Sequence, residues 1–184
     1  MPIAPTFSVI VACKNPGERL HAALTSVWDQ RDATLELIVI DGGSTDGSRE
    51  WLDSRCSDIA TFITEPDRGI YDAMNKGVAS SRGEWIYFLG ADDRLVDNRV
   101  LQQAATFLPG TDAGVVSGEA KFEDGRIYKL AKNVRPLARN FVHHQATFYR
   151  HSLFREKGGF DTALAVMADY DFNLRLWAGG VRFE

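Results

Sequence analysis

The sequence predicts an α/β domain with a mainly parallel central sheet and a small antiparallel addition in its second half. Short, continuous apolar runs such as FSVIVAC at residues 7–13 are typical of strands that are buried on both faces, as in a parallel sheet. Segments of helical period alternate with these runs, which indicates βαβ units. After Asp93 the alternation stops, and an Asp124-Gly125 dipeptide favours a tight hairpin turn.

In the first half, each element follows from a change of period. Continuous apolar runs predict strands over residues 7–13, 35–40, 59–64 and 85–89. Apolar residues at helical spacing predict helices over residues 17–30 and 70–79. Ser44 or Thr45 is expected to cap a further helix, which carries Trp51 and Leu52.

The second half is less regular. The predicted elements are a helix over residues 98–107, paired strands over 113–130, a short strand over 145–150 and an amphipathic helix over 168–178. Residues 179–184 have the pattern of a turn that leads into a strand, so we expect the chain to be cut short there. The tryptophans fit buried helix or strand faces and are expected in the core: Trp28, Trp51, Trp85 and Trp177.

Composition limits the functions that this chain can have. Its 184 residues are enough for one core without disulfides, and 45% apolar with 25% charged residues is ordinary for a soluble globular protein. The net charge of −4 argues against a dedicated nucleic-acid binder. Two cysteines are too few for a disulfide framework, which favours a reducing, cytoplasmic compartment. No apolar stretch approaches the roughly 20 residues that cross a bilayer, so no transmembrane segment is expected.

Polar turns follow each of the four strands predicted in the first half. In an open α/β sheet, ligands bind beyond the carboxyl ends of the strands, so these turns are expected to meet along one rim. Three of the turns carry carboxylates, at Asp41, at Asp67 and at the pair Asp92-Asp93. Adjacent carboxylates in a tight turn suit a hard divalent cation that shares its remaining positions with substrate phosphates. The alternative, a solvated Asp-Asp turn, is outweighed by the position after a buried strand.

Asp41 has two interpretations that the sequence leaves open. It suits contact with a donor group of a base or ribose, and it equally suits a capping aspartate at a strand-to-helix turn. Two well-known phosphate-binding loops are not found: no GxGxxG motif follows the first strand, and no GxxxxGKS/T motif occurs in the sequence.

Several blocks of the sequence resemble one family in the same order. The blocks are Ser8 to Ala12 with Asn15, Asp41 to Gly47, Asp67 to Gly77, Gly83 to Ile86 leading to Asp92-Asp93, His144 to Phe148, Gly158 to Asp161, and Ala168 to Asp171. Together they are similar to the family 2 glycosyltransferases, which have the GT-A (Rossmann-like) fold of nucleotide-diphospho-sugar transferases. The resemblance implies one domain over residues 1–184, with a nucleotide-binding half over 1–95 and an acceptor-side half over 96–184.

The resemblance also implies roles for individual residues. The positions implied for the nucleotide part of the donor are Ala12, Asn15, Asp41, Asp67, Asn75, Lys76 and Asp92. Asp93 is implied as the main ligand of a divalent cation, Mn2+ or Mg2+, and Asp92 as a second residue facing the metal or the ribose. Asp169 stands where the family keeps its general base, although Ala168 replaces the Glu that often precedes it.

The implied reaction moves a sugar from a nucleotide-diphospho-sugar, with a UDP-sugar as the first expectation, to a saccharide or lipid-linked saccharide acceptor. A divalent cation would stabilise the leaving diphosphate while Asp169 takes the proton of the acceptor hydroxyl, and a single displacement inverts the anomeric centre. The family often builds bacterial surface polysaccharides, which implies a cytoplasmic enzyme at the inner face of the membrane.

Some charged residues near these blocks keep two interpretations. Arg68 and Lys76 suit pairing with the diphosphate, or equally solvated charges at helix ends. His143 and His144 are expected to pack or hydrogen-bond near the site rather than to act in it. Asp171 is interpreted as a favourable charge at a helix N-terminus.

Three other functions were weighed against this one. A nucleotidyltransferase would share the core and the metal, but needs a glycine- and arginine-rich loop where Lys14 to Gly17 stands. A processive polysaccharide synthase needs transmembrane helices and a Gln-x-x-Arg-Trp motif, which these residues do not contain. A non-catalytic nucleotide-binding module of the same fold is compatible with Ala168 and with a short C-terminal half.

Overall fold

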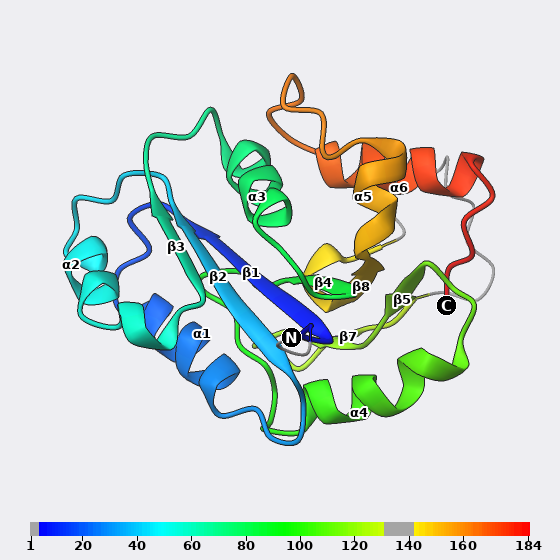
Figure 1. Ribbon diagram of the computed structural model, residues 1–184, viewed down its shortest axis with the longest axis horizontal. Coiled ribbons are helices and arrows are strands. Elements are labelled where there is room, and N and C mark those ends of the chain that lie inside the picture. Colours follow the sequence, from blue (N-terminus) through cyan, green and yellow to red (C-terminus); the bar gives the residue numbers. More distant parts are fainter. Residues whose placement is uncertain (1–3, 131–141) are drawn as a thin grey trace.

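A six-stranded sheet lies at the centre of the computed structural model, which describes residues 4–130 and 142–184 (Figure 1). The strands follow one another across the sheet in the order β3, β2, β1, β4, β8, β5. Their bounds are Phe7–Cys13 for β1, Leu35–Asp41 for β2, Thr61–Thr64 for β3, Trp85–Phe88 for β4, Val115–Ser117 for β5 and Thr147–Arg150 for β8. Strands β1 to β4 are parallel, whereas β8 is antiparallel to both of its neighbours. The predicted mainly parallel sheet is confirmed.

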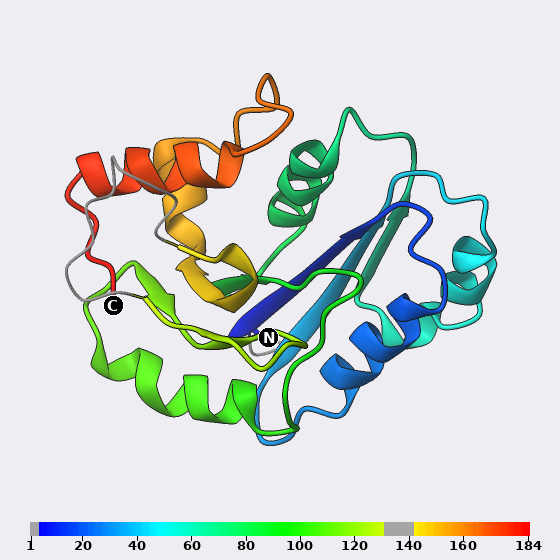
Figure 2. The ribbon, with the colours of Figure 1, turned by 180° about the vertical axis from the view of Figure 1, so that it is seen from behind.

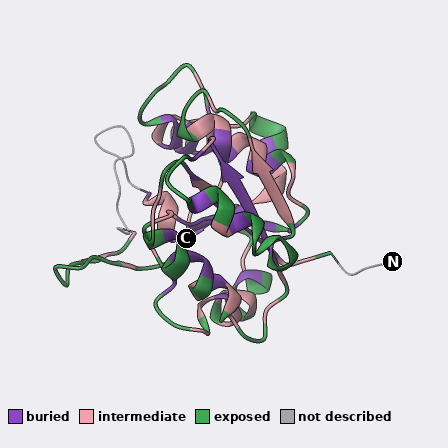
Figure 3. Cartoon of the chain, turned by 90° about the vertical axis from the view of Figure 1, so that its left-hand side faces the viewer, coloured by how far each residue is buried: buried purple, intermediate pink, exposed green. Residues whose placement is uncertain are grey.

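Helices cover both faces of this sheet. One layer consists of α1 (Arg19–Trp28), α2 (Ser48–Asp53) and α4 (Val100–Phe107), and the other of α3 (Ile70–Ala79), α5 (His151–Lys157) and α6 (Ala168–Ala178). Along β1, Val9 and Val11 pack toward the first layer and Ile10 toward the second, since successive side chains of a strand point to opposite faces. Figures 1 and 2 show the two layers from either side, and Figure 3 shows the buried strands between them. Burial on both faces explains the continuous apolar runs.

The order of the strands reverses at β1, and this reversal positions a binding site. Val9 of β1 is level with Leu37 of β2 on one side and with Tyr87 of β4 on the other. The chain therefore moves outward from β1 to β2 and β3, and then crosses back over the other face to β4. Such a switch point leaves a crevice beyond the carboxyl ends of the two central strands.

Helix α3 lies close to β1 because residue 77 is a glycine. A Cβ at Gly77 would lie 2.5 Å from Cγ2 of Ile10, which is closer than two carbon atoms can approach. Ala73 and Met74 of the same helix are also buried. The close packing brings the first turns of α3 beside the crevice.

The opposite, amino-terminal edge of the sheet is tied together by Glu36, a residue that the sequence did not single out. Its buried carboxylate accepts hydrogen bonds from Ser8 Oγ (2.6 Å) and from the backbone N–H groups of Arg82 (2.5 Å) and Gly83 (3.1 Å). The Arg82 guanidinium completes an ion pair at 2.8 Å. Burial raises the pKa of Glu36, but the bonds from Ser8 and Arg82 outweigh burial and hold this pKa below its ordinary value. Glu36 therefore links β1, β2 and the turn before β4.

The predicted hairpin is present, but it involves fewer residues than expected. Strands β6 (Ala120–Lys121) and β7 (Ile127–Tyr128) pair antiparallel, and Gly125 in the turn has a φ of 85°. This positive φ is the reason why a glycine is favoured there. Strand β5 lies within the range predicted for the hairpin but joins the central sheet through β8 instead.

Helix α2 begins differently from the prediction. It starts at Ser48 after Gly47, whose φ of 92° marks the N-cap, so neither Ser44 nor Thr45 caps it. The prediction was wrong because the hydroxyl of Ser44 donates a hydrogen bond to Asp41 (2.5 Å) within the preceding turn.

Helix α5 and the surroundings of one tryptophan also differ from expectation. The sequence did not predict α5, because its seven residues bury only Leu153 and Phe154, too few to show a helical period. Trp177 is 45% exposed near the end of α6, so its placement in the core was wrong. Trp85 is buried as predicted, while Trp28 and Trp51 are partly buried against the core.

The last residues run beside the edge of the sheet. Gly180 turns the chain with a φ of 77°, and Phe183 forms a parallel bridge with Val115 of β5. The expected turn toward a strand is therefore present. Within residues 4–130 and 142–184, no helix is both long and apolar enough to cross a bilayer.

Candidate functional site

A pocket of about 550 Å³ opens at the switch point, beyond the carboxyl ends of β1 and β4. It is lined by Ile10, Ala12, Cys13, Lys14, Asn15, Pro16, Arg19, Ile70, Met74, Phe88, Leu89, Gly90, Ala91, Asp92, His144 and Gln145. Ala12, Asn15 and Asp92 thus lie where the sequence analysis expected a donor site. The other predicted site residues are not part of this lining and lie behind or beside it: Asp41, Asp67, Asn75, Lys76, Asp93 and Asp169.

Asn15 and Asp41 join the loops that follow β1 and β2. Asn15 has a left-handed backbone (φ 50°) and accepts a hydrogen bond from the Thr45 N–H at 2.8 Å, while its own N–H donates to Ser44 Oγ at 2.8 Å. Asp41 is fully buried and accepts bonds from the Ser44 hydroxyl and from Thr64 Oγ1 (2.8 Å). Of its two interpretations, the structure favours the one in which Asp41 stabilises the turn.

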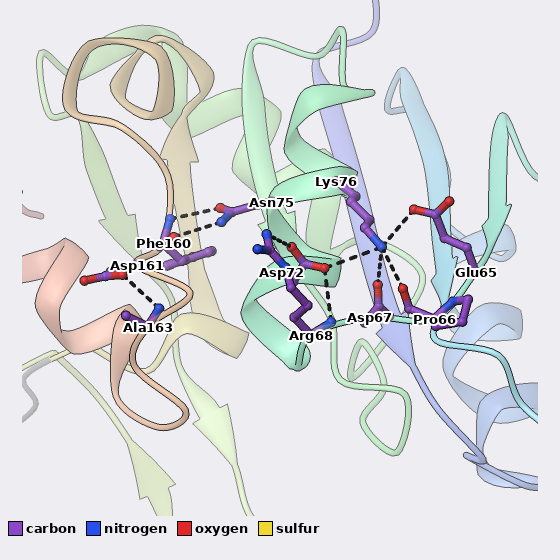
Figure 4. Close-up of polar contacts among 10 residues, drawn as sticks. All are labelled: Glu65, Pro66, Asp67, Arg68, Asp72, Asn75, Lys76, Phe160, Asp161 and Ala163. Carbon is purple, nitrogen blue, oxygen red and sulfur yellow. Dashed lines mark hydrogen bonds and ion pairs between the residues drawn. The ribbon is translucent and has the colours of Figure 1, made fainter.

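Lys76 lies in a cluster of carboxylates beside the pocket (Figure 4). Its ammonium group forms ion pairs with Asp67 (2.6 Å), Glu65 (2.8 Å) and Asp72 (3.5 Å), and hydrogen bonds with Asp67 and Glu65 raise its pKa. Arg68 pairs with Asp72 at 3.0 Å. Both cations are already neutralised by neighbouring acids, so their pairing with a diphosphate is not favoured by this arrangement.

Asn75 holds α3 to the segment that precedes α6. Its side-chain amide donates to the Phe160 carbonyl (2.8 Å) and accepts from the Phe160 N–H (2.9 Å), as Figure 4 shows. A Cβ at Gly159 would collide with the Asn75 side chain, so the glycine permits this contact. The residue therefore supports the wall of the pocket from outside it.

Asp92 and Asp93 follow β4 in a tight turn. Asp92 is largely exposed and lies 3.8 Å from the Arg19 guanidinium, whereas Asp93 turns inward and accepts a hydrogen bond from Gln145 Nε2 at 2.5 Å. Glycine is needed at residue 90, because a Cβ there would collide with the Asp93 carboxylate. Burial and the neighbouring charge of Asp92 raise the pKa of Asp93.

The carboxylate oxygens of Asp92 and Asp93 are suitable ligands for a hard divalent cation. Carboxylate oxygens are the protein ligands that Mg2+ and Mn2+ favour, and a bound cation would offset the burial and the repulsion by Asp92 that raise the pKa of Asp93. Among the described residues there is no group of three or more His, Cys, Asp or Glu side chains that could hold a metal on its own. A cation at Asp92-Asp93 would therefore need further ligands, such as phosphate oxygens and water.

Asp169 lies in the first turn of α6, outside the pocket lining. Its side chain is only 8% exposed, and its carboxylate accepts a hydrogen bond from the Tyr71 hydroxyl at 2.8 Å. Its second oxygen lies 3.1 Å from Nδ1 of His144, a residue of the short 3-10 helix η4 (His144–Ala146) that lines the pocket. Because Gln145 contacts Asp93, adjacent residues of η4 link the two carboxylates that the sequence placed in separate blocks.

His143 packs beside the pocket rather than in its lining. Its ring contacts Phe122 and Tyr128 of the hairpin region, with centroids 5.8 Å and 5.4 Å apart. Burial and the neighbouring His144 lower the pKa of His143, which favours a neutral ring. This agrees with the expectation that it packs near the site.

Several lining residues were not singled out by the sequence. Lys14 and Arg19 are cations of the pocket lining, whereas Arg68 and Lys76 are not part of it. Their signal was their position after β1, at the switch point, but sequence alone does not reveal which strand is central. Gln145, a lining residue, and Tyr71, which lies outside the lining, acquire their contacts only through folding, since their partners Asp93 and Asp169 are 52 and 98 residues away in sequence.

Curated proteins that resemble this chain are glycosyltransferases. The sequence is 34% identical over 184 residues to a PGL/p-HBAD biosynthesis glycosyltransferase of Mycobacterium bovis, an alignment that covers 95% of this chain and 71% of that protein. It is 36% identical over 185 residues to an uncharacterized glycosyltransferase of Mycobacterium tuberculosis, covering 95% of this chain and 70% of that protein.

Solved structures share the fold at lower identity. Staphylococcus aureus TarS 1-349 in complex with UDP-GlcNAc matches with a TM-score of 0.79 at 20% identity, over 92% of this chain and 52% of that one. The mannosyltransferase of Pyrobaculum calidifontis in complex with GDP-Man and Mn2+ matches with a TM-score of 0.74 at 23% identity, over 99% of this chain and 55% of that one. The chain thus spans about half the length of these structures and has their GT-A fold.

The family itself is shown by the sequence match. Residues 8–169 match the family described as Glycosyl transferase family 2, which is most of the chain and includes the loops and turns of the pocket. The match ends at Asp169, the residue that the motif order had aligned with the general base. The chain belongs to glycosyl transferase family 2.

Proposed function

We propose that this chain forms the donor-binding and catalytic core of an inverting glycosyltransferase, which moves a sugar from a nucleotide-diphospho-sugar to an acceptor hydroxyl. One observation carries the proposal: the pocket lies at the switch point, with the Asp92-Asp93 turn at one side and η4, bonded to Asp169, at another. The presence of UDP-GlcNAc and GDP-Man in structures of the same fold supports this choice of donor class.

In this proposal, the nucleotide lies along the loop after β1. Ala12 and Asn15 would contact the base, and the cations Lys14 and Arg19 would contact the diphosphate as charge-assisted donors. The predicted roles of Asp41, Asp67, Asn75 and Lys76 as direct nucleotide contacts become supporting ones, because their side chains already bond to the loops around the pocket. Asp41 bonds to Ser44 and Thr64, and Asn75 bonds to Phe160. Asp67 and Lys76 pair with each other, and Lys76 also pairs with Glu65.

Asp93, with Asp92, would hold the divalent cation. When bound, the cation would supply Lewis-acid stabilisation of the negative charge that grows on the leaving diphosphate. Asp92 is exposed enough to contact either this cation or the donor ribose. The P. calidifontis structure is a complex with GDP-Man and Mn2+, which supports a cation in this reaction.

The Asp169 carboxylate would act as the general base for the acceptor hydroxyl. Asp169 contacts His144 of η4 and Asp93 contacts Gln145 of η4, so the two carboxylates lie against adjacent residues of the same short helix. Activation of the acceptor on one side and departure of the diphosphate on the other correspond to a single displacement with inversion.

The relatives also support a class of acceptor. A relative named for PGL/p-HBAD biosynthesis is at 34% identity, which supports a role in bacterial glycolipid or polysaccharide synthesis. We propose a saccharide or lipid-linked acceptor and a cytoplasmic enzyme that works at the inner face of the membrane. For the donor we keep the expectation of a UDP-sugar, with a GDP-sugar as the alternative that the second structure represents.

Calorimetric titration with UDP, GDP, dTDP and CDP, in Mn2+ and then with a chelator, tests the donor site. We expect one nucleotide to bind, at least ten-fold more tightly with Mn2+, and Asp93→Asn to remove this metal effect. Asp112→Asn is the matched control, because Asp112 is an exposed carboxylate that pairs with Arg182 away from the pocket. A folded protein that binds none of the four nucleotides would exclude the proposed donor site. Nucleotide binding without release of the sugar from any donor would favour the non-catalytic module.

A further inference from the structure

We infer that His144 takes the proton of the acceptor and that Asp169 orients its imidazole, which lies between that carboxylate and the pocket. The inference rests on the proposed function and changes which side chain touches the acceptor. Asp169 is not part of the pocket lining, and its side chain is 8% exposed, whereas His144 lines the pocket and is 27% exposed. An acceptor hydroxyl in the pocket would therefore meet the imidazole before it meets the carboxylate.

The contact between the two residues orients the imidazole. His144 Nδ1 lies 3.1 Å from Oδ2 of Asp169. An ionised carboxylate only accepts hydrogen bonds, so the ring hydrogen of the neutral histidine belongs on Nδ1 and the lone pair on Nε2. Nε2 makes no hydrogen bond to the described part of the chain and, on the far side of the ring from Nδ1, is free to accept a proton.

Tyr71 fixes the other oxygen of the same carboxylate. Its hydroxyl donates to Oδ1 of Asp169 at 2.8 Å, and burial together with this bond raises the pKa of Tyr71 to about 12. The tyrosine therefore remains a donor at neutral pH. Its ring packs against Phe160, with centroids 5.5 Å apart, so α3 and the segment before α6 hold it in place.

The backbone at the start of α6 is also specialised for this arrangement. Met167, which precedes the helix, has a left-handed φ of 66°, a conformation that costs energy in a residue other than glycine. The α6 helix then begins at Ala168 and buries Asp169 in its first turn. Three separate segments, α3, η4 and α6, thus converge on one carboxylate.

The resulting step is balanced. The O–H bond of the acceptor breaks and its proton moves to Nε2 of His144, while the acceptor oxygen forms a bond to the anomeric carbon. The bond from that carbon to the diphosphate breaks, and its electron pair leaves with the diphosphate. The imidazolium that forms is stabilised by the ionised Asp169 and then loses its proton to water.

Hydrolysis of a nucleotide-sugar tests the inference without knowledge of the acceptor, because water can take the place of the acceptor hydroxyl. The probes are UDP-GlcNAc and GDP-Man, and the readout is release of UDP or GDP. His144→Asn keeps a donor close to the position of Nδ1, and so its bond to Asp169, but has no group at the position of Nε2. His21→Asn is the matched control, since His21 stacks on Trp51 and lies outside the pocket lining.

We expect His144→Asn to lower kcat by roughly 10²-fold or more, with the donor KM within about two-fold of the wild-type value. We also expect His144→Ala to regain turnover in proportion to added imidazole, an effect that a purely structural histidine would not produce. A His144→Asn variant with near wild-type kcat would leave Asp169 as the direct base and overturn the inference, as would a His144→Ala variant that imidazole does not rescue. No hydrolysis by the wild-type chain, with nucleotide binding intact, would instead overturn the proposed transferase activity, and the inference with it.

Discussion

Two carboxylates at opposite edges of the same sheet have opposite electrostatic surroundings. At the amino-terminal edge, buried Glu36 accepts hydrogen bonds from Ser8 and the Arg82-Gly83 backbone and pairs with the Arg82 guanidinium. At the carboxyl-terminal edge, Asp93 accepts one hydrogen bond from a side chain, that of Gln145. The neighbouring carboxylate of Asp92 repels its charge. The pKa of Glu36 is lowered and the pKa of Asp93 is raised.

The difference separates a structural carboxylate from a functional one. Burial disfavours the charge at both positions, but only Glu36 has the donors that outweigh it. A protein that keeps an incompletely compensated carboxylate beside a pocket retains an electrostatic cost, and such costs concentrate at functional sites. Loss of the Glu36 carboxylate should therefore reduce the stability of the fold, whereas loss of the Asp93 carboxylate should reduce the activity.

The largest expected effect is on turnover. Asp93→Ala should lower kcat for donor cleavage by roughly 10³-fold, because it removes the main ligand of the cation that stabilises the leaving diphosphate. The thermal midpoint should remain within a few degrees of the wild-type value, since Asp93 is only partly buried and lies in a turn rather than in the core. Steady-state rates at saturating donor and Mn2+ measure the first quantity, and calorimetry measures the second. Equal losses of turnover in Asp112→Ala would show that the effect is not specific to the pocket.

The next effect is on stability. Glu36→Ala should lower the free energy of unfolding by about 3 kcal/mol, because it leaves the buried Ser8 hydroxyl and the Arg82 N–H without their acceptor. For a chain of this size this corresponds to a fall of about 10 °C in the thermal midpoint. The fraction that remains folded should keep its turnover. Urea titration gives the free energy, and an unchanged unfolding midpoint would refute a structural role for Glu36.

The lowered pKa of Glu36 gives this prediction a pH dependence. A group with a depressed folded-state pKa contributes stability above its unfolded pKa, here near 4.5, and loses the contribution as the pH falls through the folded value. Wild type should therefore be more stable than Glu36→Gln at neutral pH, and the gap should narrow and close as the pH falls below 4.5 through the folded-state pKa of Glu36. A gap that is constant from pH 7 to pH 3 would show that the carboxylate charge contributes nothing.

The smallest effect has the opposite sign. Because the folded-state pKa of Asp93 is raised above its ordinary 3.8, its ionised form costs stability at pH values above both pKa values. Asp93→Asn, which can still accept the bond from Gln145, should stabilise the metal-free protein at pH 7 by at most about 1 kcal/mol. The gain should vanish near pH 3, and added Mn2+ should favour wild type instead. Thermal unfolding with a chelator and with Mn2+ measures both effects, and a variant that is destabilised in the chelator would contradict the comparison.

Much of the fold was predictable from local pattern. Strands β1, β2 and β4 are continuous apolar runs because both of their faces are covered, and α3 and α6 have the bounds that their helical period predicts. Where the pattern is short, as in α5 and β5, it carries too few buried residues to identify an element or its partner. The order of motifs likewise indicated the family, because several loops match at once.

The sequence by itself determined most of the elements, the family and the edge of the sheet at which the polar turns gather, because these follow from periodicity and from residues close together in the chain. Only the tertiary structure decided which of those polar residues face the pocket. The side chains of Asp41 and Lys76 are already bonded to Thr64 and Asp67, which lie in other segments of the chain. Lys14, Arg19 and His144 instead line the pocket. The physical reason is that partners distant in sequence decide whether a charged side chain is neutralised or can bind a ligand. Which partners come close depends on the packing of α3, η4 and α6 against the sheet.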